Sequence, residues 1–261
     1  MDFNGQLYIV ILIAFALYTL KLFGKFSNWN LLFLSRDKKW KLNRFYGKHF
    51  HFYNELNVKD RDRFIKRAFL LSGSINIVGR QDFKVTDDVR LFIVAAQVQL
   101  TFGFKQYFLP KFKTILIYPD AYKNKLTGNM HYGEVNPKGV IVLSWKRLVK
   151  GYMIPDDKIN LGLHEMAHAL MSTIIRSNDH ENGLDPYLRE IVKLSAKERE
   201  KINSNDHHFF RKYAGSNIFE FFAVAVEYFF EVPNEFKKEL PILYDHMVKL
   251  LKQDPTSYKK K

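Results

Sequence analysis

The sequence predicts an α+β fold preceded by one N-terminal transmembrane helix. Helical and strand-like patterns alternate along the chain, with long helical patterns at both ends. One apolar helical segment contains the motif HExxH at residues 164–168, and the run Leu7–Phe23 is apolar apart from Lys21. Together these patterns indicate a domain of mixed secondary structure joined to one apolar N-terminal helix.

The run Leu7–Phe23 predicts a membrane anchor within residues 1–24. It counts 17 residues, the lower limit for crossing a bilayer, and the Lys21 side chain is long enough to reach the interface. A cleaved signal peptide is disfavoured because Asp2 is the one charge before the run and no A-x-A-like site follows it. A buried core helix remains the alternative.

Basic residues follow this run over residues 25–44, and none precedes it. The positive-inside rule therefore predicts a single-pass protein of the cell membrane with a cytoplasmic C-terminal domain. The juxtamembrane segment could also rest on anionic headgroups, at about 1 kcal/mol per basic residue. The absence of cysteine agrees with a cytoplasmic domain.

Residues 45–255 contain no linker, heptad array or repeat, which indicates one domain followed by a basic tail at 256–261. The formal net charge of +14 makes nucleic-acid binding a rival hypothesis. The chain has no zinc-finger, RNP or convincing helix-turn-helix pattern, so no nucleic-acid partner is expected.

Three segments predict a small mixed sheet. Residues 113–118 and 139–145 are rich in Ile, Val, Leu and Tyr, and His131–Val135 is a weaker candidate for an exposed edge strand. An extended peptide could bind along such an edge by backbone pairing. His131 could touch that peptide, although a position in a solvated loop is favoured.

The HExxH motif lies in an apolar segment that continues to Ile174, and Asp156 and Asp157 are the expected N-terminal caps of this helix. Two histidines four residues apart share one helical face, so His164 and His168 can reach a single metal ion. Glu165 is then placed to take a proton from a water on that metal. The alternative is that these are polar residues on a partly exposed helix, but so apolar a helix is mostly buried and its polar groups need partners.

A second apolar helix, predicted over residues 217–231, contains two acids seven residues apart. Seven residues are nearly two turns, so Glu220 and Glu227 share a face. Glu220 could instead complete a capping box with Asn217, but that would leave Glu227 unexplained in mid-helix. Two carboxylates on a buried face fit a metal ligand and a group that orients a ligating histidine.

A group of segments between about residue 45 and 255 carries a family resemblance, namely Glu220–Pro233 (EFFAVAVEYFFEVP), Pro241, Leu243-Tyr244, Gln253–Pro255, Val140–Trp145, Thr86–Arg90 and Ile117–Pro119. Through these segments the sequence resembles the Mlc titration factor A (MtfA) family of zinc peptidases. A more distant likeness, over Tyr213–Ala223, is to the catalytic domain of anthrax lethal factor.

The resemblance implies one Zn²⁺ ion held by His164, His168 and Glu220, with water in the fourth position. It also implies Glu165 as general base, Tyr213 as a donor to the oxyanion, and Glu227 as support for a ligand. Tyr213 could instead be only a partly buried aromatic residue before a helix. In one departure, Ala169-Leu170-Met171 stands where relatives have a lysine or similar residue followed by Leu-Asp.

The sequence thus predicts a membrane-anchored zinc peptidase of the HExxH...E (gluzincin) type, acting on a peptide or protein. The alternative is a regulatory zinc protein that sequesters a partner such as a transcriptional repressor, because the family takes its name from titrating one. Glu165 and Tyr213 favour catalysis, since binding alone requires neither.

Overall fold

The computed structural model describes residues 9, 11–15, 18, 30–124, 128–178, 185–204 and 207–258. Most of the predicted anchor Leu7–Phe23 therefore lies outside the described residues, and those that are described in it are helical and exposed. Across the described ranges, no helix combines the length and apolar character needed to cross a bilayer.

A four-stranded mixed sheet has the strand order β1-β2-β6-β5. Its strands are β1 (Asn76–Gly79), β2 (Thr114–Tyr118), β5 (Gly133–Asn136) and β6 (Val140–Ser144), and β3 (Tyr122–Lys123) pairs with β4 (Met130–His131) in a separate ribbon. β1, β2 and β6 are parallel, whereas β5 runs antiparallel to β6 and forms one edge. The α+β fold and the two stronger strand predictions are confirmed, and the weak one is a real edge strand.

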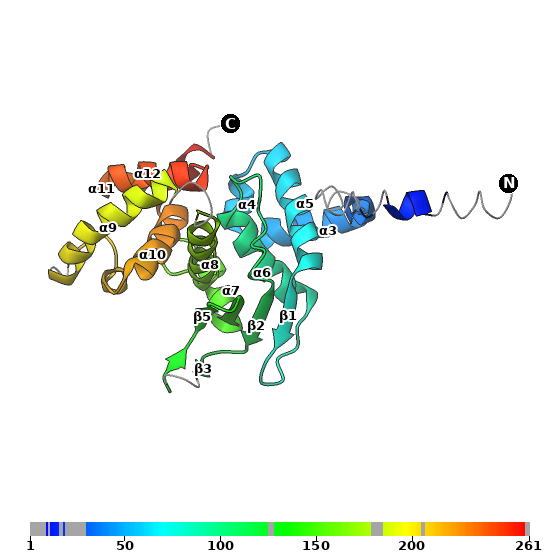
Figure 1. The fold of residues 1–261 in the computed structure, drawn as a ribbon, viewed down its shortest axis with the longest axis horizontal. Coiled ribbons are helices and arrows are strands. Elements are labelled where there is room, and N and C mark those ends of the chain that lie inside the picture. Colours follow the sequence, from blue (N-terminus) through cyan, green and yellow to red (C-terminus); the bar gives the residue numbers. More distant parts are fainter. Residues whose placement is uncertain are drawn as a thin grey trace.

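In Figure 1 the sheet lies in the lower part of the view, and most of the helices lie above it. The helices are η1 (Asn30–Phe33), α3 (Arg36–His49), α4 (His51–Glu55), α5 (Val58–Ser74), α6 (Asp87–Leu100), α7 (Trp145–Met153), α8 (Leu161–Asn178), α9 (Pro186–Ser204), η2 (Lys212–Gly215), α10 (Ile218–Glu231), α11 (Pro233–Glu239), α12 (Pro241–Leu251) and η3 (Pro255–Ser257). In Figure 1, α9 to α12 gather at one side, α3 to α6 at the other, and α8 lies between the two groups.

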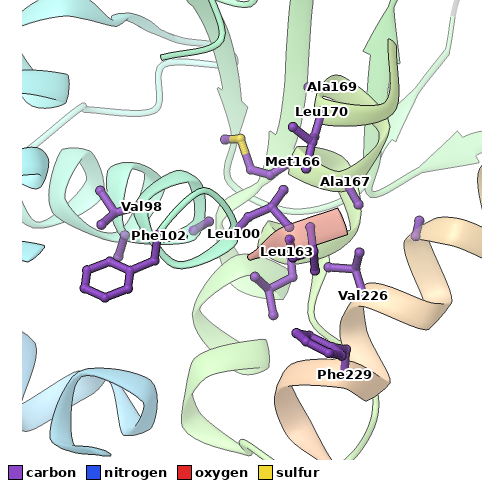
Figure 2. Close-up of a cluster of buried hydrophobic side chains, with 14 of the residues drawn as sticks. Val98, Leu100, Phe102, Leu163, Met166, Ala167, Ala169, Leu170, Val226 and Phe229 are labelled. Carbon is purple, nitrogen blue, oxygen red and sulfur yellow. The ribbon is translucent and has the colours of Figure 1, made fainter. Parts of the chain in front are cut away.

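The buried face of α8 fixes the rotation of that helix. Figure 2 shows Leu163 and Ala167 of α8 close to Val226 of α10, in a cluster that also includes side chains from the C-terminal end of α6. All of these side chains are fully buried. Because this face packs in the core, the adjacent face of α8 is turned toward α10 and β5. That adjacent face carries the histidines.

The predicted start of the HExxH helix was wrong. α8 begins at Leu161, and its cap is Asn160, whose Oδ1 accepts a hydrogen bond from the Leu163 amide at 3.1 Å. Asp157 instead accepts from the Ile159 amide at 3.0 Å, and Lys158 has a left-handed φ of 65°. This turn separates the two aspartates from the helix.

Candidate metal centre

Two helices bring three metal-ligand atoms together. His164 and His168 project from α8, and Glu220 projects from the first turn of α10. His164 Nε2 lies 3.0 Å from Glu220 Oε2 and 3.2 Å from His168 Nε2, and His168 Nε2 lies 3.5 Å from Glu220 Oε2. These residues form the one group of three or more ligand-type side chains found in the described part of the chain with metal-binding spacing.

This spacing fits a tetrahedral zinc site. Ligand atoms about 2.0–2.1 Å from zinc at tetrahedral angles lie about 3.3 Å from one another, close to the three distances observed. The His164 Nδ1 atom faces a carboxylate at 3.0 Å, so a neutral His164 donates from Nδ1 and leaves a lone pair on Nε2. Lone pairs that converge this closely need a cation or a proton among them.

Only the Asn217 half of the predicted capping box is observed. Asn217 Oδ1 accepts hydrogen bonds from the Phe219 and Glu220 amides at 2.9 and 3.0 Å, so Asn217 does cap α10. The Glu220 carboxylate, however, is directed to the histidines. Burial opposes its ionisation, but hydrogen bonds from His164 and His168 outweigh that effect and hold the pKa of Glu220 well below its usual range.

The Glu227 carboxylate orients His164 through its Nδ1 atom. Its Oε2 accepts from His164 Nδ1 at 3.0 Å, its Oε1 accepts from the Asn160 amide at 2.8 Å, and its side chain is 1% exposed. Arg211 makes an ion pair with the same carboxylate. One buried acid therefore joins the start of α8, the first histidine and a cation from the segment before η2.

The site favours positive charge. Burial lowers the pKa of His164, but hydrogen bonds to Glu220 and Glu227 outweigh burial and raise the pKa to about 10. The surplus of carboxylates that stabilises an imidazolium would also stabilise a bound divalent cation.

Glu165 is buried beside these ligands. It is 4% exposed, and its Oε2 has no hydrogen-bond partner among the described residues. Burial raises the pKa of Glu165 to about 7, against the opposing effect of the two histidines. Gly133, the first residue of β5, packs on the carboxylate so closely that a Cβ there would lie 2.2 Å from Oε1. This oxygen is buried and unpartnered on a side chain that lines the cleft, and a buried polar atom without a partner calls for a functional explanation.

Tyr213 lies on η2, with its ring centroid 6.0 Å from that of His164 and its side chain about half exposed. Partial burial and the Glu220 carboxylate raise its pKa to about 12, so the hydroxyl keeps its proton at neutral pH and can donate it in a hydrogen bond. All six site residues expected from the sequence are thus gathered in one place.

A cleft extends from the centre in two directions. The apolar arm, of about 570 Å³, is lined by Phe112, Val135, Pro137, Ile175 and Phe219. The basic arm, of about 540 Å³, is lined by Met130, Tyr132, Arg147, Lys150, Ile159 and Leu161. His131, His164, Glu165 and Tyr213 border both arms. His131 therefore belongs to the cleft, on β4, and the expectation of a solvated loop position was wrong.

The departure from the family pattern at Ala169-Leu170-Met171 is explained by packing in the hydrophobic core. Ala169, Leu170 and Met171 are at most 5% exposed and belong to the hydrophobic core. Support for the centre comes from Glu227 and Arg211. Sequence reasoning missed Arg211, because it lies two residues before Tyr213 in a segment without periodicity.

The chain is similar in sequence to one protein family and to several known proteins. The family model described as glucose-regulated metallo-peptidase M90 matches residues 34–252. An uncharacterized protein of Synechocystis sp. is 26% identical over 230 residues, covering 80% of this chain and 82% of the relative. Proteins named Mlc titration factor A from Yersinia enterocolitica and Yersinia pestis are both 27% identical, covering 77% of this chain and 81% and 80% of their own lengths.

Proposed function

Because this chain belongs to the glucose-regulated metallo-peptidase M90 family, we propose that it is a membrane-anchored, zinc-dependent peptidase. The observation that carries the proposal is the convergence of His164, His168 and Glu220 at tetrahedral spacing beside the unpartnered Glu165 carboxylate. Three protein ligands leave a fourth position open, which is typical of catalytic rather than structural zinc sites.

The donor set fits zinc, whose ordinary ligands are imidazole nitrogen and carboxylate oxygen. When bound, zinc acts as a Lewis acid that lowers the pKa of water toward ~7 and polarises a carbonyl. The Glu165 carboxylate would take a proton from the water whose oxygen bonds to the carbonyl carbon, and would return that proton to the amine nitrogen as the C–N bond breaks. The Tyr213 hydroxyl, protonated at neutral pH, donates to the carbonyl oxygen as negative charge develops there.

The substrate would lie along β5. This strand borders the cleft through Gly133, Glu134 and Val135, and one of its two sides is already paired with β6. A peptide added to the free side gains backbone hydrogen bonds that do not depend on its sequence.

The direct test of the proposed activity uses the purified full chain in detergent micelles and a library of internally quenched peptides. Hydrolysis should require zinc, stop on addition of a chelator and return on addition of zinc. Glu165→Gln should retain one zinc per chain and lose hydrolysis by a factor of about 10³ or more. Turnover by this variant at the rate of the wild type would remove the mechanism.

The anchor and its orientation belong to the same proposal. The apolar run Leu7–Phe23 and the basic residues that follow it support a single span with the peptidase domain in the cytoplasm. Reporter fusions at each terminus test this orientation. A C-terminal reporter found outside the cytoplasm would contradict it.

The name Mlc titration factor A, carried by the two Yersinia relatives described above, favours a second function. In this alternative the chain holds zinc but acts by sequestering a regulatory protein. Tight capture of a partner, without any chelator-sensitive cleavage by the wild type, would support it over the peptidase.

A further inference from the structure

The two arms of the cleft differ in charge. Beyond the residues common to both arms, the charged residues of the apolar arm are Glu134, Arg176 and the candidate metal ligand Glu220. The basic arm has three cations, Arg147, Lys150 and Arg211, and its acids are Glu165 and Glu227. A substrate therefore meets different electrostatic surroundings on the two sides of the metal centre.

Two of these cations form no ion pair with an acid in the described part of the chain. Arg211 is paired with Glu227, which is also bonded to His164. Neither Arg147 nor Lys150 has a carboxylate within 4.0 Å among the described residues. They lie three residues apart on α7 and therefore share the face of that helix that borders the cleft.

The Arg147 guanidinium is held in place by an aromatic ring. Its Cζ lies 4.3 Å from the centroid of Tyr132, which borders the same arm. A stacked guanidinium keeps its N–H groups free at the edge, where they can bind a carboxylate in a bidentate manner. Lys150, which is exposed, adds a second positive charge on the same arm.

The direction of a bound peptide is set by the edge strand. From residue 129 to residue 137 the chain runs from the basic arm, past Gly133 at the metal centre, to the apolar arm. Antiparallel pairing is the more stable arrangement. A peptide antiparallel to β5 places the residues before its scissile bond in the apolar arm and those after it in the basic arm.

We propose that Arg147 and Lys150 form a carboxylate-binding subsite that selects peptides with a negative charge just after the scissile bond. The proposal rests on the peptidase function proposed above. The carboxylate can belong to an Asp or Glu side chain or to the C-terminus of a short substrate, and the chemistry recognised is the same.

The test compares quenched peptides that share one apolar residue before the scissile bond. Three of the peptides are C-terminally amidated and carry Glu, Gln or Lys directly after the scissile bond. The fourth peptide ends at the residue after the scissile bond and has a free C-terminal carboxylate. The wild-type chain should cleave the Glu peptide with a kcat/KM roughly tenfold above that of the Gln peptide. The Lys peptide should be the poorest substrate.

Variants assign the preference to residues. Lys150→Gln and Arg147→Gln should each reduce the Glu-to-Gln ratio of kcat/KM, and the double variant should bring it near one. Lys146→Gln is the matched control, because Lys146 is on the same helix but pairs with Asp120 outside the cleft. A binding assay with the hydrolysis-deficient Glu165→Gln protein should show the same preference as a difference in Kd.

Each outcome separates the two proposals. Chelator-sensitive cleavage with equal kcat/KM for the Glu and Gln peptides would overturn the subsite and leave the peptidase proposal standing. Absence of cleavage for every peptide would remove the peptidase proposal, and this subsite with it. A preference for the free-acid peptide over the amidated Glu peptide would support the subsite and identify the C-terminus as its carboxylate.

Discussion

Replacing Gly133 by alanine should displace the Glu165 carboxylate without removing a metal ligand. A Cβ at this position would lie 2.2 Å from Glu165 Oε1, 2.7 Å from Glu165 Cδ and 2.7 Å from Leu161 Cδ1. Ordinary contacts begin at 3.4 Å, so the carboxylate must retreat by about 1.2 Å, the difference between 3.4 and 2.2 Å. Glu165 is buried and borders the cleft, so a displacement of this size changes the position of its carboxylate relative to a bound substrate.

A shift of about 1 Å in a catalytic group lowers the rate roughly 10²-fold. Gly133→Ala should therefore reduce kcat/KM by about 100-fold while the zinc Kd changes by less than about threefold. The free energy of unfolding should fall by about 1–3 kcal/mol, the range for inserting a carbon into a packed site.

The assays are steady-state hydrolysis of a quenched peptide, zinc titration and denaturant unfolding, all on the same preparation. Gly73→Ala is the matched control, because a Cβ at Gly73 meets nothing within 4 Å, and its kcat/KM and zinc Kd should equal those of the wild type. Gly133→Ala protein with turnover within threefold of the wild type would refute the role of Glu165 as a base held against β5. Loss of zinc together with activity would show that the effect is not specific to Glu165.

The contacts of the site support three further predictions. Glu227→Gln should weaken zinc binding by about 10–100-fold, because the carboxylate orients His164, and competition with a chromogenic chelator measures this; unchanged affinity would contradict the orienting role. Tyr213→Phe should lower kcat by about 100-fold with little change in KM, and an equal rise in KM instead would indicate a role in binding. Burial raises the pKa of Glu231 from 4.5 in the unfolded chain to about 8, so the folded state holds an extra proton between those values and the free energy of unfolding falls as pH rises through that window. Glu231→Gln should flatten this slope and stabilise the protein at pH 8 by on the order of 2–4 kcal/mol in urea unfolding. The exposed control Glu239→Gln should do neither. Parallel slopes for the wild type and Glu231→Gln would contradict the raised pKa of Glu231.

The sequence was most informative where the chemistry depends on local spacing. Two histidines four residues apart share a face of any α-helix, and Glu220 and Glu227 share one seven residues apart, so their common orientation needed no tertiary information. The choice between a capping and a ligating role for Glu220 could not be made this way. It depends on how α10 crosses α8, which the core between the two helices determines.

Features that depend on long-range contact were missed. Arg211 reaches Glu227 from an irregular segment, and nothing periodic marks it. β1 has four residues, too few for a pattern of alternation. The aspartates after Pro155 have good capping chemistry, but the left-handed Lys158 turns the chain before α8 begins. Only in the case of the aspartates did the path of the chain override a local preference.

The central claim is that two imidazoles and one carboxylate from two helices hold a single zinc ion. X-ray absorption at the zinc edge, on protein loaded with one equivalent of zinc, tests it most directly. The expected spectrum shows nitrogen and oxygen neighbours at about 2.0–2.2 Å with the scattering of two imidazole rings, reduced to one ring in His168→Ala. A first shell without imidazole, or a spectrum that His168→Ala leaves unchanged, would contradict the claim.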